Sequence, residues 1–559
     1  MSASKTERKM RMTRLFPLAL GAIAWVLSSG VARAAAPGIA GPNFQLTAQP
    51  AYLTQPDGQM VYSWGYGCEG TPSFLPAAIS GAFCNAMQVP GPTLIVHEGD
   101  QVTVSLHNQL PTAAGNTSIL FPGFNVSTSC GSGTGVQGLL TCEAAPGGTV
   151  TYSFTASIPG TRAYYSGTQG DLQVEMGLYG VIVVLPSHVP SVCGSLGVSS
   201  GATTGLPVTN PGGNSKARAF WSESEFRLAA AAYDHPDTCY DREYLFQFSE
   251  IDPNVHAQAL AQVNAAVCAP LTPSGGLPST CRLEVPTEPY HPAYFMINGR
   301  SMPDDMDPNY SVQYPHQPYN GNPHMHPGEM VLLRIVGQGR WQHPFHEHAN
   351  HVRILARDGN LILSSGTIQY AGTSSAVAGL AGPLLFTTTT TPGQAMDGIF
   401  YYTGRGLNWD LYGHNPSSSD PSATLSCTPD ADGYNTGAPT AINYFEWCQD
   451  HNKPMQANPF GDVAGGGPVT LPDPNLFTNG SWYGGSPYLG PDATGRAVGA
   501  TGTTPPSGTI ANSPSGEAGF AFMWHSHNER EITTNNIFPG GMLMMMLVDS
   551  REFVIDESM

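Results

Sequence analysis

Charged residues are scarce in this sequence. They make up 11% of its 559 residues, whereas glycine occurs 65 times and proline 49 times. Long surface helices need charged and straight-chain residues on their exposed faces, so this composition argues against a helical protein. It favours short strands joined by many turns, and we expect an all-β fold. A chain of this length exceeds one ordinary core and indicates two to four domains.

Basic residues are the scarcer of the two charge types. The sequence has 22 Lys and Arg against 41 Asp and Glu, which gives a formal net charge of −19 at pH 7. Such a chain repels the phosphate backbone of nucleic acids, so we expect no nucleic-acid partner. The same excess of negative charge can attract cations.

Long apolar runs are missing from most of the chain. The run Leu15–Leu27 follows five basic residues and precedes Ala32-Arg33-Ala34, the pattern of an export signal with a small-residue cleavage site. No later run reaches the ~18 apolar residues that a membrane-spanning helix needs. We therefore predict a signal peptide at residues 1–34, no transmembrane segment, and a periplasmic or extracellular location.

Common catalytic templates find little support. The sequence contains no phosphate-binding glycine-rich loop with a lysine and no His-Glu-x-x-His helix motif. Its acidic residues are scattered, so no carboxylate pair for hydrolysis can be named. Hydrolase and nucleotide-dependent chemistry are therefore not indicated.

Cysteines are few but even in number. Ten cysteines in an exported chain indicate disulfides rather than thiol chemistry. Sequence alone cannot fix their connectivity. Pairing of neighbours would give Cys68–Cys84, Cys130–Cys142, Cys193–Cys239, Cys268–Cys281 and Cys427–Cys448.

Strand patterns fall into two regions. In the first, the alternation around a Glu-Gly-Asp turn in LIVHEGDQVTVSLHN predicts a hairpin, and a second strand pair surrounds QVEMGLYGVIVVLP. Residues 187–216, rich in Gly, Ser, Pro and Thr, are the predicted linker, and residues 411–517 form a predicted loop-rich insertion. In the second region we expect one short helix over Asn254–Val267 and strands in EYLFQFSEID, AYFMINGRSM, EMVLLRIVGQG, PGQAMDGIFYY, GFAFMWHSH and GGMLMMMLV.

Two His-x-His pairs are the most informative feature. His346 and His348 lie in HPFHEHANHVRIL, and His525 and His527 lie in MWHSHNEREITTNN. Alternate residues of a strand project from one face, so each pair can offer two imidazoles to one point. Imidazole binds copper, zinc, iron and nickel alike, so the spacing leaves the metal open.

Three other groups have a weaker claim to metal binding. His324-Met325-His326 could present two nitrogens and a thioether from a loop, although loop histidines are usually just solvated. His351 follows the first pair and is better explained as a surface or hydrogen-bonded histidine. Consecutive strand residues alternate faces, so Met542, Met544, Met545 and Met546 cannot all converge, and packing in the core is the favoured role.

Four segments, in this order, resemble the multicopper oxidase family. They are VPGPTLIVHEGDQVTVSLHNQLP, PGTRAYYSGTQGDLQVEMGLYGVIVV, EMVLLRIVGQGRWQHPFHEHANHVRIL and FMWHSHNEREITTNNIFPGGM. The resemblance implies tandem cupredoxin-like Greek-key β-sandwich domains, one over residues 37–186 and one over residues 217–555 with the insertion inside it. It also implies copper as the cofactor and a small molecule or metal ion as substrate. It leaves the oligomeric state open.

The first domain departs from the family pattern. Where members of the family read Thr-Ser-Ile-His-Trp-His-Gly, this chain has Leu120, Phe121 and Pro122 after Thr-Ser-Ile. Where they read Tyr-His-Ser-His, it has Tyr165, Ser166 and Gly167 after Tyr164. The first domain is therefore expected to contribute none of its four copper-ligating histidines.

The second domain keeps part of the pattern. By the resemblance, His343 corresponds to a type 1 copper ligand, and His346, His348, His525 and His527 correspond to ligands of the trinuclear copper cluster. Ser526 replaces the cysteine of the type 1 site, and Glu531 stands about where its second histidine belongs. A blue copper site needs a cysteine sulfur, so neither the colour nor the usual electron path is expected.

A reduced metal site could remain. His343, His346, His348, His525 and His527 are its candidate ligands, and Glu347, Glu529 and Glu531 are candidate carboxylate ligands or hydrogen-bond acceptors of the imidazoles. The leading hypothesis is an exported copper-dependent oxidoreductase. The alternatives are a non-catalytic copper-binding or cell-surface interaction protein, and histidines that only hydrogen-bond at a buried edge.

Overall fold

A computed structural model describes residues 36–131, 133–193, 225–273, 276–326, 329–369, 376–402, 426–431, 435–437 and 518–549, together with 555 and 557. It also gives the backbone of four short strands, β13 (Leu206–Thr209), β14 (Ser215–Arg218), β27 (Gly485–Leu489) and β28 (Ile510–Ala511). The predicted signal peptide lies outside these residues, as do most of the predicted linker and insertion. No helix among the described residues is long and apolar enough to cross a membrane.

The first sandwich consists of two five-stranded sheets of mixed direction. One sheet has the order β11-β12-β5-β1-β4 and the other β3-β2-β6-β10-β7. The bounds are β1 Gly38–Ala40, β2 Asn43–Thr54, β3 Met60–Cys68, β4 Phe74–Leu75, β5 Leu94–His97, β6 Gln101–Asn108, β7 Ser127–Ser129, β10 Thr149–Thr155, β11 Gly160–Tyr165 and β12 Tyr179–Leu185. Minor elements are η1 (Thr112–Ala114), the hairpin of β8 (Gly135–Gln137) and β9 (Cys142–Ala144), α1 (Gly170–Gln173) and η2 (Ser191–Cys193).

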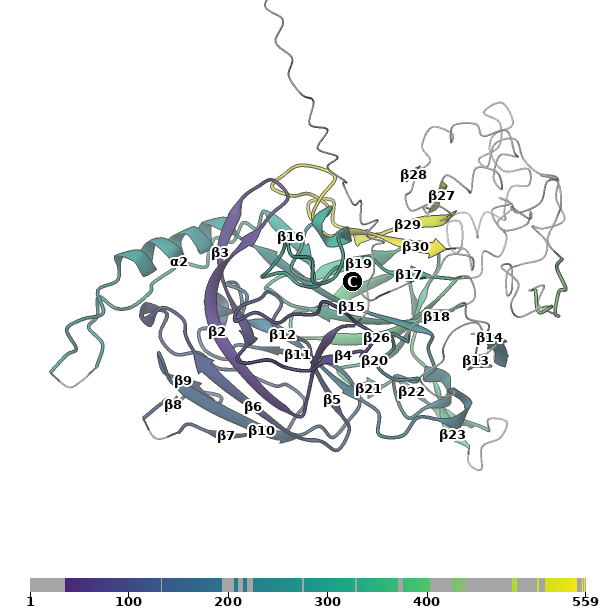
Figure 1. Ribbon diagram of the computed structural model, residues 1–559, viewed down its shortest axis with the longest axis horizontal. Coiled ribbons are helices and arrows are strands. Elements are labelled where there is room, and N and C mark those ends of the chain that lie inside the picture. The colour runs from purple at the N-terminus through teal and green to yellow at the C-terminus, as the bar shows by residue number, and fades with distance from the viewer. Residues whose placement is uncertain are drawn as a thin grey trace, which may run out of the picture.

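The second sandwich packs a sheet of order β16-β15-β18-β26-β20-β21 against one of order β17-β30-β29-β19-β25. The bounds are β15 Arg242–Ile251, β16 Tyr294–Ile297, β17 His324–Met325, β18 Met330–Gly337, β19 His343–Glu347, β20 Val352–Arg357, β21 Asn360–Leu361, β24 Leu384–Leu385, β25 Thr387–Thr390, β26 Ala395–Tyr401, β29 Ala518–Ser526 and β30 Leu543–Asp549. The remaining elements are η3 (Pro236–Thr238), α2 (Pro253–Ala265), η4 (Asp304–Met306), and the hairpin of β22 (Leu363–Ile368) and β23 (Val377–Leu380). The expected all-β class with tandem sandwiches is confirmed (Figure 1).

The four sheets lie in layers. Inside the second sandwich, Phe246 and Leu333 of one sheet meet Phe345 and Trp524 of the other in one core. Between the sandwiches, apolar residues of β5, β11 and β12 pack on residues of β15, β18 and β26. The sheet that holds β19 and β29 is therefore the outermost layer, on the side of the second sandwich away from the first.

One prediction about pairing is wrong. β5 and β6 do not form a hairpin, because β5 pairs with β1 and β12 whereas β6 pairs with β2 and β10 in the opposite sheet. The turn between them crosses the sandwich, with Gly99 at φ 93°. Alternation of apolar residues shows that two strands follow each other, but it does not show whether they bond to each other.

Helix α2 follows a strand of the second sandwich in sequence but packs against the first sandwich. Asp252 caps its first turn through a hydrogen bond from Asn254 N at 2.9 Å, and a proline occupies the next position, where it is best tolerated. This confirms the predicted helix to within two residues. Val255 and Ala259 pack into the core of the first sandwich, so a helix that follows β15 in sequence ties the two domains together.

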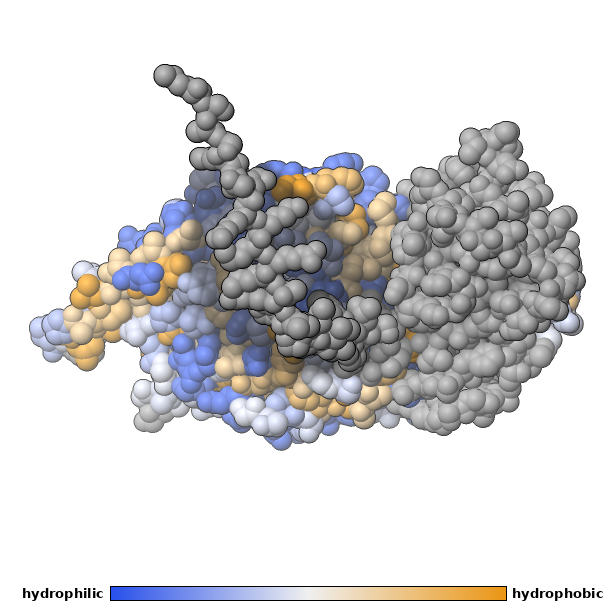
Figure 2. Space-filling model, turned by 45° about the horizontal axis from the view of Figure 1, so that its top comes forward, coloured by the Kyte–Doolittle hydropathy of each residue, from blue (hydrophilic) through white to orange (hydrophobic). Residues whose placement is uncertain are grey.

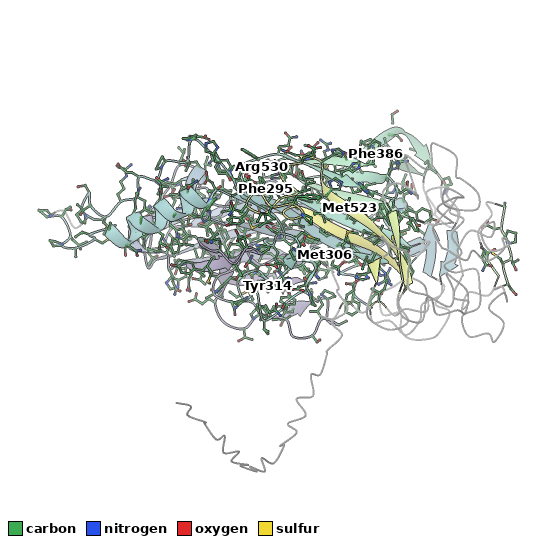
Figure 3. All side chains as sticks on the ribbon, turned by 90° about the horizontal axis from the view of Figure 1, so that it is seen from above. Phe295, Met306, Tyr314, Phe386, Met523 and Arg530 are labelled. Carbon is green, nitrogen blue, oxygen red and sulfur yellow. A yellow bond between two sulfur atoms is a disulfide. The ribbon has the colours of Figure 1, made fainter. Side chains whose placement is uncertain are left out.

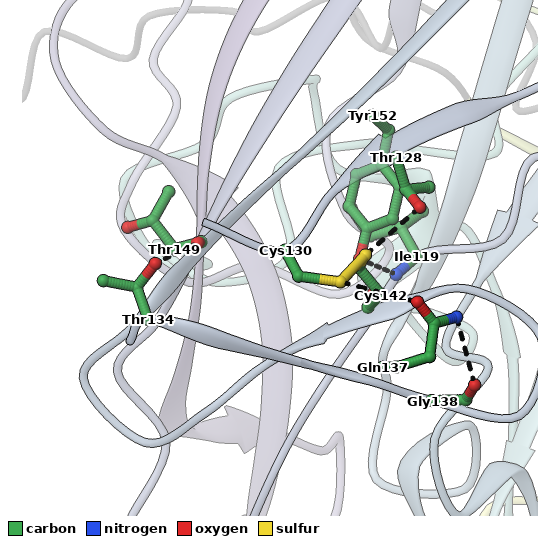
Figure 4. The surroundings of a disulfide bond; sticks show 9 residues. All are labelled: Ile119, Thr128, Cys130, Thr134, Gln137, Gly138, Cys142, Thr149 and Tyr152. Carbon is green, nitrogen blue, oxygen red and sulfur yellow. Dashed lines mark hydrogen bonds between the residues drawn. A yellow bond between two sulfur atoms is a disulfide. The ribbon is translucent and has the colours of Figure 1, made fainter. Parts of the chain in front are cut away.

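Four of the predicted disulfides are present, namely Cys68–Cys84, Cys130–Cys142, Cys193–Cys239 and Cys268–Cys281. Cys427 is also disulfide-bonded, but its predicted partner, Cys448, lies outside the described residues. Cys130–Cys142 joins β9 to the segment before β8, beside Tyr152 (Figure 4). Cys268–Cys281 closes the arm beyond α2, in which Val267 and Leu271 are exposed. The projection at the left of Figure 2 has a partly apolar surface.

Removal of one buried carboxylate should destabilise the domain interface. Asp397 accepts hydrogen bonds from Thr161 of the first sandwich and from Tyr233, and lies 3.7 Å from Arg334. All four side chains are buried, so Asp397→Ala leaves a buried cation partly unpaired. We expect a loss of about 3–5 kcal/mol in the free energy of unfolding, measured by urea denaturation.

The matched control is Glu288→Ala, which breaks an ion pair with Arg340 in which Glu288 is 72% exposed. That change should cost less than about 1 kcal/mol. Equal stability losses in the two variants would contradict the role given to Asp397.

Candidate metal centre

Strand pairing brings the two predicted histidine segments together. β19 and β29 are antiparallel neighbours, and in their register His346 stands opposite His525. On each strand the aromatic neighbours, Phe345 and Trp524, point into the core. Because strand residues alternate faces, the histidines occupy the outer face of the sheet.

The ring nitrogens of three histidines converge. His346, His348 and His525 each offer one ligand atom, and these atoms all lie within 4.8 Å of one another. The Nε2 atoms of His348 and His525 are 3.1 Å apart. His527 lies beside this set, with its ring centre 4.8 Å from that of His346. We refer to these four residues as the histidine cluster.

Hydrogen bonds orient two of the rings. The Nδ1 of His525 donates to the carbonyl oxygen of Ser526 at 2.7 Å, which leaves its Nε2 lone pair directed at His348. The Nδ1 of His346 is 2.6 Å from the hydroxyl of Thr387 on β25. Burial, together with the neighbouring His525 and His527, lowers the pKa of His346 to about 4, and burial also lowers the pKa of His525. Both rings are therefore neutral at neutral pH.

The surroundings of the cluster are partly apolar and partly open. The ring of Phe386 lies edge-on to His346 with centres 5.7 Å apart, and Phe386 is 42% exposed. Met523 is 37% exposed and precedes His525 by two residues on the same face of β29 (Figure 3). His527 is exposed, whereas His346 and His348 are buried. The cluster therefore meets solvent along its His525 and His527 edge.

Backbone geometry after β19 is unusual. Ala349, the residue after His348, is fully buried at φ 81°, a conformation that costs a non-glycine residue roughly 1–3 kcal/mol. The indole of Trp524 donates to the carbonyl of His348 at 3.0 Å and holds this turn in place. The backbone of His348 is thus held by the buried turn at Ala349 and by the hydrogen bond from Trp524.

His343 lies apart from the histidine cluster. It is three residues from His346, an odd offset that places it on the inner face of the strand. Its Nε2 lies 3.0 Å from Glu250 and its Nδ1 lies 2.8 Å from Glu531, so carboxylates occupy both ring nitrogens. Ser526 donates to Glu531 at 2.5 Å. Glu250, His343, Ser526 and Glu531 are named here the interior cluster.

The three carboxylates predicted as ligands or acceptors have different roles. Glu531 belongs to the interior cluster and bonds to His343 rather than to the histidine cluster. Glu347 faces the core, accepts a hydrogen bond from Thr388 at 3.0 Å, and burial raises its pKa well above the usual range. Glu529 is exposed.

The first domain has no imidazole at the positions where the resemblance places ligands. Phe121 is buried and packs against Tyr152, Phe154 and Tyr164. Leu120 forms an isolated β-bridge with Tyr165. Apolar and aromatic side chains thus surround these positions in the first sandwich.

The weaker candidates are also placed. His324 and His326 are buried rather than solvated, which corrects the prediction for that loop. In the part of the chain that the structure describes, they form no group of three or more metal-binding side chains with converging ligand atoms. His351 is half-buried with its ring 4.9 Å from that of Phe386. The predicted core role is confirmed for Met542, Met544 and Met546.

Sequence reasoning missed Glu250 and Thr387. Glu250 lies on β15, 93 residues before its partner His343, and no local pattern connects them. Thr387 belongs to the run TTTT of β25, which was not identified as a strand. The odd spacing between His343 and His346 was the one available signal that they face different sides.

Part of the first sandwich matches the model of a known protein family. Residues 78–188 match the family model described as multicopper oxidase. The first sandwich carries a multicopper oxidase domain. The matched residues belong to the sandwich in which the resemblance predicts no copper-ligating histidines. The histidine cluster lies in the second sandwich.

Individual relatives agree with this multicopper oxidase domain. The iron transport multicopper oxidase fetC of Epichloe festucae is 36% identical over 101 residues, which are 18% of this chain and 15% of the relative. Laccase-3 of Botryotinia fuckeliana is 38% identical over 95 residues, 17% of this chain and 20% of the relative. The iron transport multicopper oxidase FET3 of Saccharomyces cerevisiae is 36% identical over 108 residues, 19% of this chain and 16% of the relative. These matches therefore span a fifth or less of each relative.

A solved structure aligns more broadly and less closely. The blue copper oxidase from Nitrosomonas europaea covers 90% of this chain and 85% of its own, at 14% identity and a TM-score of 0.39.

The interior cluster predicts a pH dependence of stability. Burial opposes a charge on His343, but hydrogen bonds and charges from Glu250 and Glu531 outweigh it and raise its pKa to about 9 from the ordinary histidine value of 6.5. A raised folded-state pKa contributes stability that is complete below about pH 6.5 and is lost as the pH rises through about 9. The contribution is roughly 3 kcal/mol at one pKa unit per 1.36 kcal/mol.

Urea denaturation of the metal-free protein, repeated at steps of about one pH unit between pH 6 and 10, tests this pH dependence of stability. The wild type should lose stability over that range, and His343→Gln should lack the titrating component. Parallel stability profiles for the two proteins would contradict the charged state assigned to His343.

Proposed function

We propose that this protein binds copper through His346, His348 and His525, with His527 beside them, and acts as a copper-dependent oxidoreductase without a type 1 centre. The observation that carries the proposal is the convergence of three imidazoles from two strands in register, with two Nε2 atoms 3.1 Å apart. His343 is not part of the proposed ligand set, because carboxylates occupy both of its nitrogens.

The spacing of the nitrogens fits one ion. Imidazole nitrogens bind a divalent metal at roughly 2.0–2.1 Å, so two of them on one ion at ~90–110° stand roughly 2.9–3.4 Å apart. The distance between His348 Nε2 and His525 Nε2 falls in this range. Three imidazoles form a donor set that copper accepts. The choice of copper rather than zinc rests on the multicopper oxidase domain in the same chain.

Neighbouring groups prepare the imidazoles for a metal. The carbonyl of Ser526 and the hydroxyl of Thr387 bind the Nδ1 atoms of His525 and His346. Such partners fix the orientation and tautomer of a ligand and increase its basicity. Copper held there would supply one-electron redox chemistry.

Access to the site differs from that in the family pattern. Without a cysteine ligand, no type 1 site relays electrons, so reductant and oxidant must both reach the histidine cluster itself. The open edge formed by His525 and His527 permits this, with Phe386 and Met523 nearby. The proposed substrates are small molecules or metal ions, because His346 and His348 are buried whereas His525 and His527 lie at the exposed edge of the described residues.

Export is part of the proposal. Disulfides form and persist in oxidising compartments, and four have both cysteines among the described residues. Together with the predicted signal peptide at residues 1–34, they support a periplasmic or extracellular protein.

Loss of two ligands should abolish metal retention. The double variant His348→Ala, His525→Ala removes the pair of facing Nε2 atoms, and we expect it to retain no stoichiometric copper by elemental analysis of protein dialysed against a weak chelator. The matched control is His351→Ala. His351 is half-buried with its ring against Phe386 and is outside the group of converging nitrogens, so this variant should retain copper as the wild type does.

Oxygen consumption separates the two functional classes. Wild-type protein loaded with copper should take up oxygen with phenols, Cu(I), Mn(II) or Fe(II), and the double variant should not. Bound copper without oxygen uptake would favour a non-catalytic copper-binding protein. Absence of stoichiometric metal in the wild type would refute both.

Copper-loaded protein should be pale. The intense blue of type 1 sites needs a thiolate ligand, and Ser526 occupies that position with its hydroxyl bonded to Glu531. A visible absorption spectrum of the copper-loaded wild type should show only weak bands. An intense blue preparation would show that the ligand set is wrong.

A further inference from the structure

We propose that the carboxylate of Glu531 takes the place of a metal ion in the interior cluster and acts as a positioning residue for His525 and His527. This inference rests on the proposed function, because it concerns the ligands of the same copper site. By the resemblance, Glu531 stands about where a type 1 copper ligand belongs, and the role proposed for it needs no copper ion at that position.

Three side chains meet at one oxygen atom. Glu531 Oε2 accepts from Ser526 Oγ at 2.5 Å and from His343 Nδ1 at 2.8 Å. By the family resemblance, these three positions would hold the cysteine and the two histidines of a type 1 copper. The side chains that would converge on an ion converge here on an oxygen supplied by one of them.

Hydrogen bonds hold the side chains of the interior cluster in place. His343 stands between Glu531 and Glu250, and all three are at most 1% exposed. Glu250 is held in turn by the backbone N–H groups of Arg340 and Trp341, at 2.7 and 2.8 Å. The ring of His343 is thus held between two carboxyl groups, and the hydroxyl of Tyr290 donates a further hydrogen bond to Glu250.

The segment that carries the ligands is tied to Glu531. Asn528 donates to Glu531 Oε1 at 2.9 Å, and its own N–H bonds to Ser526 Oγ. The backbone of Met542 joins the two ends, since Met542 N donates to Glu531 O and Met542 O accepts from Ser526 N. Residues 526–531 therefore form a closed loop around one carboxylate.

Strand alternation transmits this constraint to the metal ligands. Ser526 lies between His525 and His527, and a side chain fixed toward the interior forces both neighbours toward the outer face. The carbonyl of Ser526 also orients the ring of His525. Glu531 thus acts on the histidine cluster through Ser526 without touching it.

The test compares Glu531→Gln and Glu531→Ala with Glu529→Gln. Glu529 is exposed and closer in sequence to His527, so its variant measures the general effect of removing a nearby negative charge. Cu(II) affinity is measured by competition with a chelator, and the ligand geometry by electron paramagnetic resonance. Circular dichroism checks that each variant is folded.

We expect Cu(II) affinity to fall roughly 10–100-fold in Glu531→Ala, the range typical of residues that orient a metal ligand. Its copper resonance should change, because the rings of His525 and His527 move. Glu531→Gln keeps the size and an acceptor for Ser526, so it should fall between Glu531→Ala and wild type. Glu529→Gln should match wild type in both readouts. Wild-type affinity and resonance in folded Glu531→Ala and Glu531→Gln would overturn the proposal.

A second readout works without copper. Amide hydrogen exchange of the peptide covering residues 524–531 in metal-free protein should accelerate in Glu531→Ala and Glu531→Gln but not in Glu529→Gln. If wild type binds no copper, the proposed function fails while this experiment still decides the role of Glu531. Unchanged exchange in both Glu531 variants would refute it.

Discussion

The antiparallel pairing of β19 with β29 is the constraint on which the rest depends. These strands come from segments almost 180 residues apart, and their register sets His346 opposite His525. A shift by one residue would turn every histidine of the cluster into the core and every aromatic residue out of it. The burial of Phe345 and Trp524 prevents that shift, because both lose contact with water only in the observed register.

The same two strands carry two sites of opposite character. On the outer face, imidazoles face one another, and burial lowers the pKa of His346 and of His525. On the inner face, one imidazole is held between two carboxylates. Period-two alternation separates these environments by the thickness of a single sheet, so a change in one need not alter the charge state of the other.

Much of the architecture could be predicted from sequence. The alternation in EYLFQFSEID, EMVLLRIVGQG and GFAFMWHSH gave strands β15, β18 and β29, and the His-x-His spacing led to the histidine cluster. Pairing was harder, as the separation of β5 from β6 shows, because local patterns do not encode partners. The place of His343 was predictable only from the parity of its spacing. Its partner Glu250 was not, since their contact depends on how two sheets stack.

The layered arrangement has a consequence for exchange at the surface. Since the histidine cluster lies on the sheet farthest from the first sandwich, that sandwich does not have to swing aside for an ion or small molecule to come and go. Access to the site is then limited by rotamer changes of a few side chains at the rim, on the nanosecond scale of exposed residues, rather than by the slower hinge motions of whole domains. The first sandwich can accordingly vary in sequence without opening or closing the path.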